Sequence, residues 1–206
     1  MMVQGARASD RSPDAAAEAA EDMRLVAGAA AGDRRMFAAL YRRHLESAYR
    51  RLTRMIGPEP DRDDLIQQIF LDVYRALPRF RGEARFSTFL HRIVVNVAYE
   101  HLERIRRQAG RTRAFTSEDL DALTAPDPSP EARARHRQEL ALVFARLDEL
   151  SPKRRVAFVL VAVEEMSLAE AAALLGATPD AVKQRVREAR QDLAQTLGPV
   201  EQKEQS

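Results

Sequence analysis

Residues 167–190 read SLAEAAALLGATPDAVKQRVREAR and contain two helix starts separated by a glycine. Ser167 and Glu170 have the spacing of a capping box, in which the two side chains satisfy free backbone N–H groups at the start of a helix. Gly176 suits the left-handed residue that ends a helix. Thr178, followed by a proline, has the form of an N-cap before the first helical residue. The spacing therefore predicts a helix-turn-helix.

The second helix of a helix-turn-helix enters the major groove of DNA and presents its outer face to bases and phosphates. Arginine pairs bidentately with guanine, glutamine pairs with adenine, and lysine suits phosphate. The sequence therefore predicts a DNA-reading face, and its candidate contacts are Thr178, Lys183, Gln184, Arg185, Arg187 and Arg190.

The residues around this motif extend the helical pattern. Ser151-Pro152 predicts another capped helix start, and apolar residues at helical spacing follow it to Val163. We expect residues 136–198 to form one small domain, with a tail at 199–206. Residues 111–135 collect prolines and acids, which predicts a flexible linker. Its 25 residues reach up to about 80 Å at about 3.3 Å each.

Three amphipathic helices are predicted in the first half of the chain. Their apolar faces run from Phe37 to Met55, from Leu65 to Leu77 and from Phe86 to Ile105. Three such faces can enclose one core, so we expect a domain over residues 23–110. Residues 1–22 have no large hydrophobic residue after Val3, which predicts a disordered tail, although the alanine-rich run from Ala15 to Ala20 could extend the first helix by a turn.

The predicted fold class is all-α, because no segment alternates polar and apolar residues with a period of two. We expect two small helical domains joined by a flexible linker. No stretch approaches 18 consecutive apolar residues, and the N-terminus lacks the apolar core of a signal peptide. Membrane spanning and export are therefore not expected.

Composition narrows the possible functions. The chain has no cysteine, which excludes a disulfide scaffold, a thiolate zinc site and a cysteine nucleophile. The four histidines lack metal-ligand spacing, and no phosphate-binding loop or G-x-S-x-G elbow is present. We therefore expect no enzymatic activity, no metal, no cofactor and no small-molecule substrate.

Positive charge is concentrated in the first half, although 33 Lys and Arg against 31 Asp and Glu leave a net charge of only +2. Two arginine-rich blocks lie at residues 24–58 and 75–113. The third predicted helix also has a polar stripe at three- and four-residue steps, which includes Arg85, Thr88, Arg92 and Asn96. Such a stripe can follow one strand of nucleic acid, so nucleic acid is the expected partner.

The chain resembles the extracytoplasmic-function (ECF, group IV) sigma factors of bacterial RNA polymerase. Residues 64–77, DLIQQIFLDVYRAL, and 80–96, FRGEARFSTFLHRIVVN, are similar to the second conserved region of that family. Residues 150–158, 167–176 and 181–190 resemble its fourth region. The resemblance extends over about residues 24–197, and the order and spacing of the two regions match the family.

The resemblance implies a sigma factor that directs core polymerase to promoters, melts the minus-10 element and recognises the minus-35 element. The implied partners are the beta and beta-prime subunits of core RNA polymerase, promoter DNA and an anti-sigma factor. The implied location is the cytoplasm, with retention at the inner membrane where the anti-sigma factor is a membrane protein. By the same resemblance, the linker passes through the polymerase between the two DNA-binding domains.

The resemblance also assigns residues to sites. The implied contacts with core polymerase are Asp64, Gln67, Gln68, Leu71 and Arg75. A base flipped from the minus-10 element would be held by Phe80, Arg85, Ser87, Thr88, Arg92 and Asn96, because an amide reads a base edge through paired hydrogen bonds. The fourth-region helix, with the six candidates from Thr178 to Arg190 given above, would read the minus-35 element.

Two positions depart from the family pattern. Phe89 stands where the family usually has tryptophan, and it can still pack in the core. Glu188 stands where the family usually has arginine, and it could either accept from cytosine or pair with a neighbouring arginine. The alternative function is a conventional helix-turn-helix regulator with a helical N-terminal sensing or dimerisation domain. Such a protein would bind duplex DNA alone and would not need the 64–77 surface.

Overall fold

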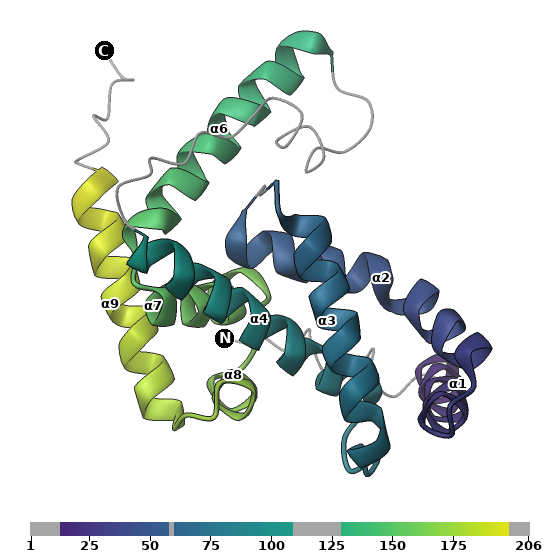
Figure 1. Cartoon of the computed structure of the whole chain (residues 1–206). Coiled ribbons are helices and arrows are strands. Elements are labelled where there is room, and N and C mark those ends of the chain that lie inside the picture. The colour runs from purple at the N-terminus through teal and green to yellow at the C-terminus, as the bar shows by residue number, and fades with distance from the viewer. Residues whose placement is uncertain (1–12, 58–59, 109–128, 198–206) are drawn as a thin grey trace, which may run out of the picture.

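The computed structural model describes residues 13–57, 60–108 and 129–197, and these ranges contain helices and turns but no strand (Figure 1). The all-α prediction is confirmed for this part of the chain. The elements are α1 (Pro13–Ala30), α2 (Arg34–Ile56), α3 (Arg62–Ala76), the 3-10 turn η2 (Leu77–Arg79), α4 (Phe86–Arg107), α6 (Pro130–Glu149), α7 (Pro152–Phe158), the π-helical turn η3 (Val159–Val163), α8 (Leu168–Leu175) and α9 (Pro179–Leu197).

The three helices predicted in the first half are α2, α3 and α4. Asp33 caps α2, where its side chain accepts hydrogen bonds from the backbone N–H groups of Arg35 and Met36. The apolar faces of these helices meet as expected, and Leu52, Ile69 and Val94 are fully buried. The helix-period pattern alone therefore located this bundle.

The N-terminal helix α1 corrects the prediction of a disordered tail. Residues 13–22 are helical, and Leu25, Val26 and Ala29 further along α1 are buried against the bundle. Asp22 is only 7% exposed and accepts a 2.8 Å hydrogen bond from Arg43 Nε. Packing against α2 orders this alanine-rich segment, so the low hydrophobicity of residues 13–22 was a misleading signal. Residues 1–12 lie outside the described residues.

The start of α6 shortens the predicted linker. The linker was expected to reach residue 135, but α6 begins at Pro130, where proline is favoured because its ring already has a helical φ angle. Phe144, Leu147 and Leu150 from this helix and its end pack with Ala189 of α9. Residues 109–128, and with them most of the predicted linker, lie outside the described residues.

The helix-turn-helix has the predicted caps. The Ser167 hydroxyl accepts from the backbone N–H of Glu170, whose carboxylate accepts in turn from the Ser167 backbone N–H, so the capping box is complete. Gly176 has a φ of 57°, as a left-handed helix stop requires. Ser151 caps α7, and the Thr178 hydroxyl accepts from the Ala181 backbone N–H at 3.2 Å.

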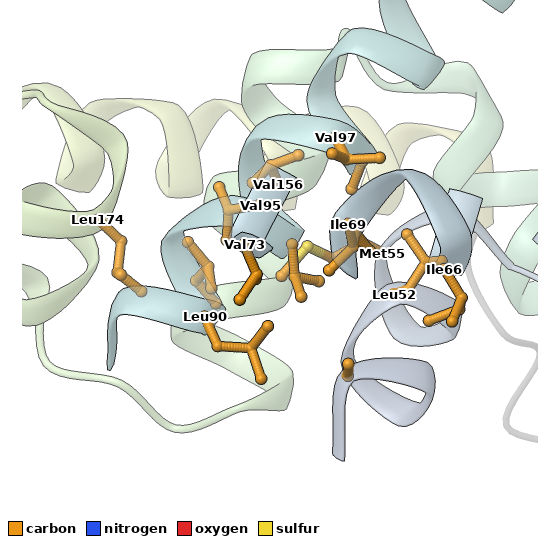
Figure 2. Close-up of a cluster of buried hydrophobic side chains, with 14 of the residues drawn as sticks. Leu52, Met55, Ile66, Ile69, Val73, Leu90, Val95, Val97, Val156 and Leu174 are labelled. Carbon is orange, nitrogen blue, oxygen red and sulfur yellow. The ribbon is translucent and has the colours of Figure 1, made fainter. Parts of the chain in front are cut away.

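Helix α4 lies at the centre of the molecule and packs against both halves of the chain. It contacts α2 and α3 on one side and α7 and α8 on the other (Figure 1). Val156 of α7 and Leu174 of α8 belong to the same hydrophobic cluster as Leu52, Ile69 and Leu90 of the N-terminal bundle (Figure 2). The two helical units therefore share one continuous core.

Arg155 of α7 forms a polar link between the two units. Its side chain is only 1% exposed, and its Nε donates a 2.6 Å hydrogen bond to the Met55 carbonyl in the last turn of α2. Its Nη1 donates to the carboxylate of Asp148. The C-terminal end of a helix carries partial negative charge, so a guanidinium stabilises the end of α2 here.

Helix α4 contains a buried histidine. His101 is 3% exposed, and Arg104 Nη2 lies 3.0 Å from its Nδ1. A guanidinium can only donate, so Nδ1 accepts and the ring is neutral. Burial, followed by the positive charge of Arg104, lowers the pKa of His101 to about 4.

We expect the free energy of unfolding to decrease as the pH falls from 6.5 towards 4. In this window an unfolded His101 is largely protonated whereas the folded ring is neutral, so acid favours the unfolded state. The loss reaches at most about 1.4 kcal/mol per pH unit. Urea unfolding at pH 7 and pH 5 should show a smaller loss for His101→Asn than for wild type. His136→Asn, at an exposed histidine of α6, should keep the wild-type loss; equal losses in all three proteins would contradict the prediction.

Candidate polymerase and promoter interfaces

The outer face of α3 carries the residues assigned to polymerase binding. Ile66, Ile69, Phe70 and Val73 point into the core, which leaves the opposite face to solvent. All five candidates from that face are exposed: Asp64, Gln67, Gln68, Leu71 and Arg75. The structure therefore places this set together on one helix surface.

Leu71 gives this polar surface an apolar element. Its side chain is 50% exposed, and that of Tyr74, one turn along, is 43% exposed. Polar contacts surround the leucine, because Gln68 donates to Asp72 at 2.9 Å and Arg75 lies 3.5 Å from the same carboxylate. Protein-binding surfaces typically have apolar side chains at the centre and polar side chains around them, as this surface does.

A cavity of about 690 Å³ lies where the loop of residues 80–85 meets α4. Four of the six minus-10 candidates line it, namely Phe80, Ser87, Thr88 and Arg92. Of the other two, Arg85 precedes α4 and lines a neighbouring cavity, and Asn96 is exposed one turn beyond Arg92. Thr88, Arg92 and Asn96 share one helix face at four-residue steps, so the cavity continues into a polar track along α4.

Aromatic rings and arginines give this cavity its chemistry. The rings of Phe80 and Phe89 lie 4.8 Å apart, and both rings pack near Phe86. The expectation that Phe89 packs in place of tryptophan is thus confirmed. Flat apolar walls suit a nucleobase, and arginine side chains suit the phosphates that accompany it.

Three arginines in this cavity were missing from the predicted set. Arg51 of α2, Arg79 of η2 and Arg81 of the loop line it together with Arg92. The pKa of Arg51 is lowered by burial, and the nearby charge of Glu164 opposes this shift. The two arginine-rich blocks identified in the sequence were the available signal, but a linear pattern does not show that these side chains converge.

Helix α8 and the segment before it form another wall of the same cavity. Met166, Glu170, Ala173 and Leu174 face the loop and α4 across it. Nearby, Glu164 Oε2 lies 3.1 Å from His91 Nε2 of α4, and both side chains are almost fully buried. Residues from the helix-turn-helix unit thus complete a cavity that begins in the N-terminal bundle.

The outer face of α9 carries most of the predicted DNA-reading residues. Val182, Val186 and Ala189 are buried, and Thr178, Lys183, Gln184, Arg187 and Arg190 are exposed. Arg185 is the exception. It is half-buried on the flank of the helix, where its charge acts on Tyr99 of α4. The recognition set is therefore centred on Gln184 and Arg187.

Glu188, the second departure from the family pattern, pairs with a neighbouring arginine. Its Oε2 accepts a 2.9 Å hydrogen bond from Arg154 Nε of α7, and its Oε1 accepts a 2.7 Å bond from Gln184 Nε2. These bonds, the one from Gln184 first, lower the pKa of Glu188 below its usual value. The sequence left two roles open for Glu188, and the structure shows the second of them, a pair with a neighbouring arginine.

Among the described residues, no three or more histidine or acidic side chains are grouped as a metal ion would require. No helix in the described ranges combines the length and the apolar character needed to cross a membrane.

Comparisons with known proteins identify the two helical units. The family model of Sigma-70 region 2 matches residues 40–108, and that of Sigma-70, region 4, matches residues 140–193. The ECF RNA polymerase sigma factor SigM of Mycobacterium tuberculosis is 35% identical over 178 residues, which cover 86% of this chain and 85% of SigM. SigE of Mycolicibacterium smegmatis is 34% identical over 158 residues, and the chain spans 60% of the length of that relative.

A solved structure agrees with these matches. The RNA polymerase sigma factor CnrH of Cupriavidus metallidurans is 37% identical over 183 residues, which cover 85% of this chain and 94% of CnrH. The structure of CnrH in complex with the cytosolic domain of CnrY superposes with a TM-score of 0.59 at 30% identity. It covers 86% of this chain and 97% of the CnrH chain.

Two Sigma-70 regions in this order, on an all-helical fold, define a sigma factor of bacterial RNA polymerase. The chain belongs to the ECF family of sigma factors. Members of this family are not enzymes. They act in the cytoplasm, where they bind core polymerase and promoter DNA to initiate transcription. The family match favours this function over that of a conventional helix-turn-helix regulator.

Proposed function

We propose that three surfaces of the protein, on α3, α4 and α9, each bind a different partner during transcription initiation. The outer face of α3 binds the beta-prime clamp of core polymerase, the cavity beside α4 receives a flipped minus-10 base, and the outer face of α9 reads the minus-35 element. The observation that carries this proposal is the cavity, because its aromatic walls and arginines match what an unstacked nucleotide needs.

The minus-10 assignment follows from the arrangement of α4. A flipped base would stack in the cavity near Phe80, with Ser87 and Thr88 within reach of its edge. Arg92 would contact the adjoining strand along the polar track, and the Asn96 amide would read a base edge through paired hydrogen bonds. Extraction of a base from the duplex costs a few kcal/mol, which these contacts have to offset.

The two-unit organisation follows from the same assignment. We propose that the unit from α1 to α4 acts as the minus-10 and core-binding domain, and that the unit from α6 to α9 acts as the minus-35 domain. The acidic linker between them would pass through the polymerase. The linker falls largely outside the described residues, so this part of the proposal depends on its composition and length.

We further propose control by an anti-sigma factor. The relative CnrH was solved in complex with the cytosolic domain of CnrY. A partner of this kind would hold the sigma factor inactive until a signal releases it. Where such a partner is a membrane protein, it would keep the sigma factor at the inner membrane.

Transcription in vitro tests the proposed function as a whole. Purified protein and core polymerase without sigma factor are added to a genomic promoter library, and the transcript start sites are sequenced. New starts that share two spaced upstream elements are the expected result. Absence of new starts, together with duplex binding by the protein alone, would instead indicate a regulator.

Asn96→Ala tests the minus-10 assignment. We expect unchanged affinity for core polymerase and promoter opening reduced by about 5- to 150-fold, because a bidentate base contact is worth about 1–3 kcal/mol. Opening is measured with a fluorescent base analogue in the minus-10 element. Glu100→Ala, at an exposed residue one turn further along α4, is the control and should not reduce opening. Wild-type opening by the Asn96 variant would contradict the assignment.

A further inference from the structure

Glu188 connects the scaffold of the helix-turn-helix to the residue at the centre of its outer face. Arg154 of α7 donates to Glu188 through Nε and to Asp192 through Nη1, at 2.9 and 2.7 Å. Two carboxylates on α9 thus hold the guanidinium between them. The carboxylate of Glu188 is therefore fixed by a side chain from another helix, and it is this fixed group that accepts from Gln184 at 2.7 Å.

The chemistry of this bond decides which way the Gln184 amide faces. An ionised carboxylate can only accept hydrogen bonds, so the amide nitrogen of Gln184 has to point towards Glu188. The Gln184 carbonyl oxygen and the second N–H of the amide are then left for another partner. That pair of groups matches adenine, which offers an N6 donor and an N7 acceptor in the major groove.

Glu188 itself is poorly placed to read a base. Both of its carboxylate oxygens already accept hydrogen bonds, one from Gln184 and one from Arg154. Its negative charge also opposes DNA binding among the basic residues of α9.

We propose that Glu188 is a positioning residue for minus-35 recognition, which holds the Gln184 amide in the orientation that reads adenine. This inference rests on the proposed role of α9. Preorganisation raises the affinity for the base, because the Gln184 side chain is already ordered and loses little conformational entropy on binding. The promoter is accordingly expected to carry an A·T pair opposite Gln184.

The experiment compares two variants that remove the same charge. Core polymerase is combined with wild type, Glu188→Ala or Glu188→Gln, and promoters randomised over the minus-35 element are transcribed and sequenced. In Glu188→Ala the preference for one base over the others at a single minus-35 position should fall by about 3- to 10-fold. The overall affinity of this variant for DNA should stay equal or increase. Glu188→Gln retains an acceptor for the Gln184 N–H and should keep most of that preference.

Gln184→Ala and the double variant identify the base pair concerned. Gln184→Ala should abolish the preference at the same base pair, and adding Glu188→Ala should then change nothing more at that position. If Gln184→Ala alters a preference that Glu188→Ala leaves intact, the positioning role is wrong although α9 still reads DNA. If Gln184→Ala alters no preference, both the positioning role and the assignment of Gln184 to minus-35 reading are wrong.

Discussion

Leu71→Asp should abolish stable binding to core polymerase while the free protein keeps its fold. The leucine is 50% exposed on the side of α3 opposite the buried Ile69 and Val73, so the substitution removes no core contact. Surface changes of this kind alter the free energy of unfolding by about 0.5 kcal/mol or less. An aspartate in the centre of an interface, in contrast, brings an unpaired charge into a desolvated patch.

The expected loss of affinity is at least about 30-fold, since a central interface residue contributes about 2 kcal/mol or more. A fluorescence titration of labelled protein with core polymerase measures it, and thermal unfolding checks the fold. Leu71→Met keeps an apolar side chain of similar size and should bind almost as wild type does. If the aspartate variant bound core polymerase with wild-type affinity, α3 would not be part of the polymerase interface.

Arg155→Ala should cause the largest loss of stability among single substitutions between the two helical units. The variant leaves the Met55 carbonyl without its 2.6 Å donor and Asp148 without its guanidinium partner. Removal of one partner from a buried charged contact costs about 3–5 kcal/mol. Urea unfolding measures the loss, and hydrogen exchange should show that α4 and α7 lose protection.

The neighbouring arginine provides a matched control. Arg154 is 37% exposed, and the partners described for it lie on α9, within the same helical unit. Exposed ion pairs contribute little to stability, so Arg154→Ala should be the milder change. Equal losses for the two variants would show that Arg155 does not hold the units together.

Local signals in the sequence located most helices, because each is encoded by neighbouring residues. The capping box at Ser167 and the left-handed Gly176 required no knowledge of the rest of the chain. The α3 surface was equally accessible, since one helix supplies all of its candidates. The beginning of α1 was left open by the alanine-rich run at residues 15–20, because burial of Asp22 beside Arg43 depends on α2.

The packing of the two units could not be predicted from local sequence either, because it depends on residues that are far apart in the chain. Arginine is rarely buried, so nothing in the sequence distinguished Arg155 from its neighbour Arg154. The cavity beside α4 also combines side chains from α2, the loop and α8, which lie far apart in the chain. Its outline was predicted only through family resemblance, and the contribution of α8 was not predicted at all.

The shared hydrophobic core stabilises the free protein but lowers its apparent affinity for the promoter. On the proposed function the two units engage separate promoter elements and have to be drawn apart, which removes Val156 and Leu174 from their contact with the N-terminal bundle. Binding to polymerase and DNA must supply that free energy, so the apparent affinity equals the intrinsic affinity multiplied by the fraction of molecules already open. Arg155→Ala should therefore have opposite effects in two assays. The free protein becomes easier to unfold, and the holoenzyme assembles at a lower sigma concentration.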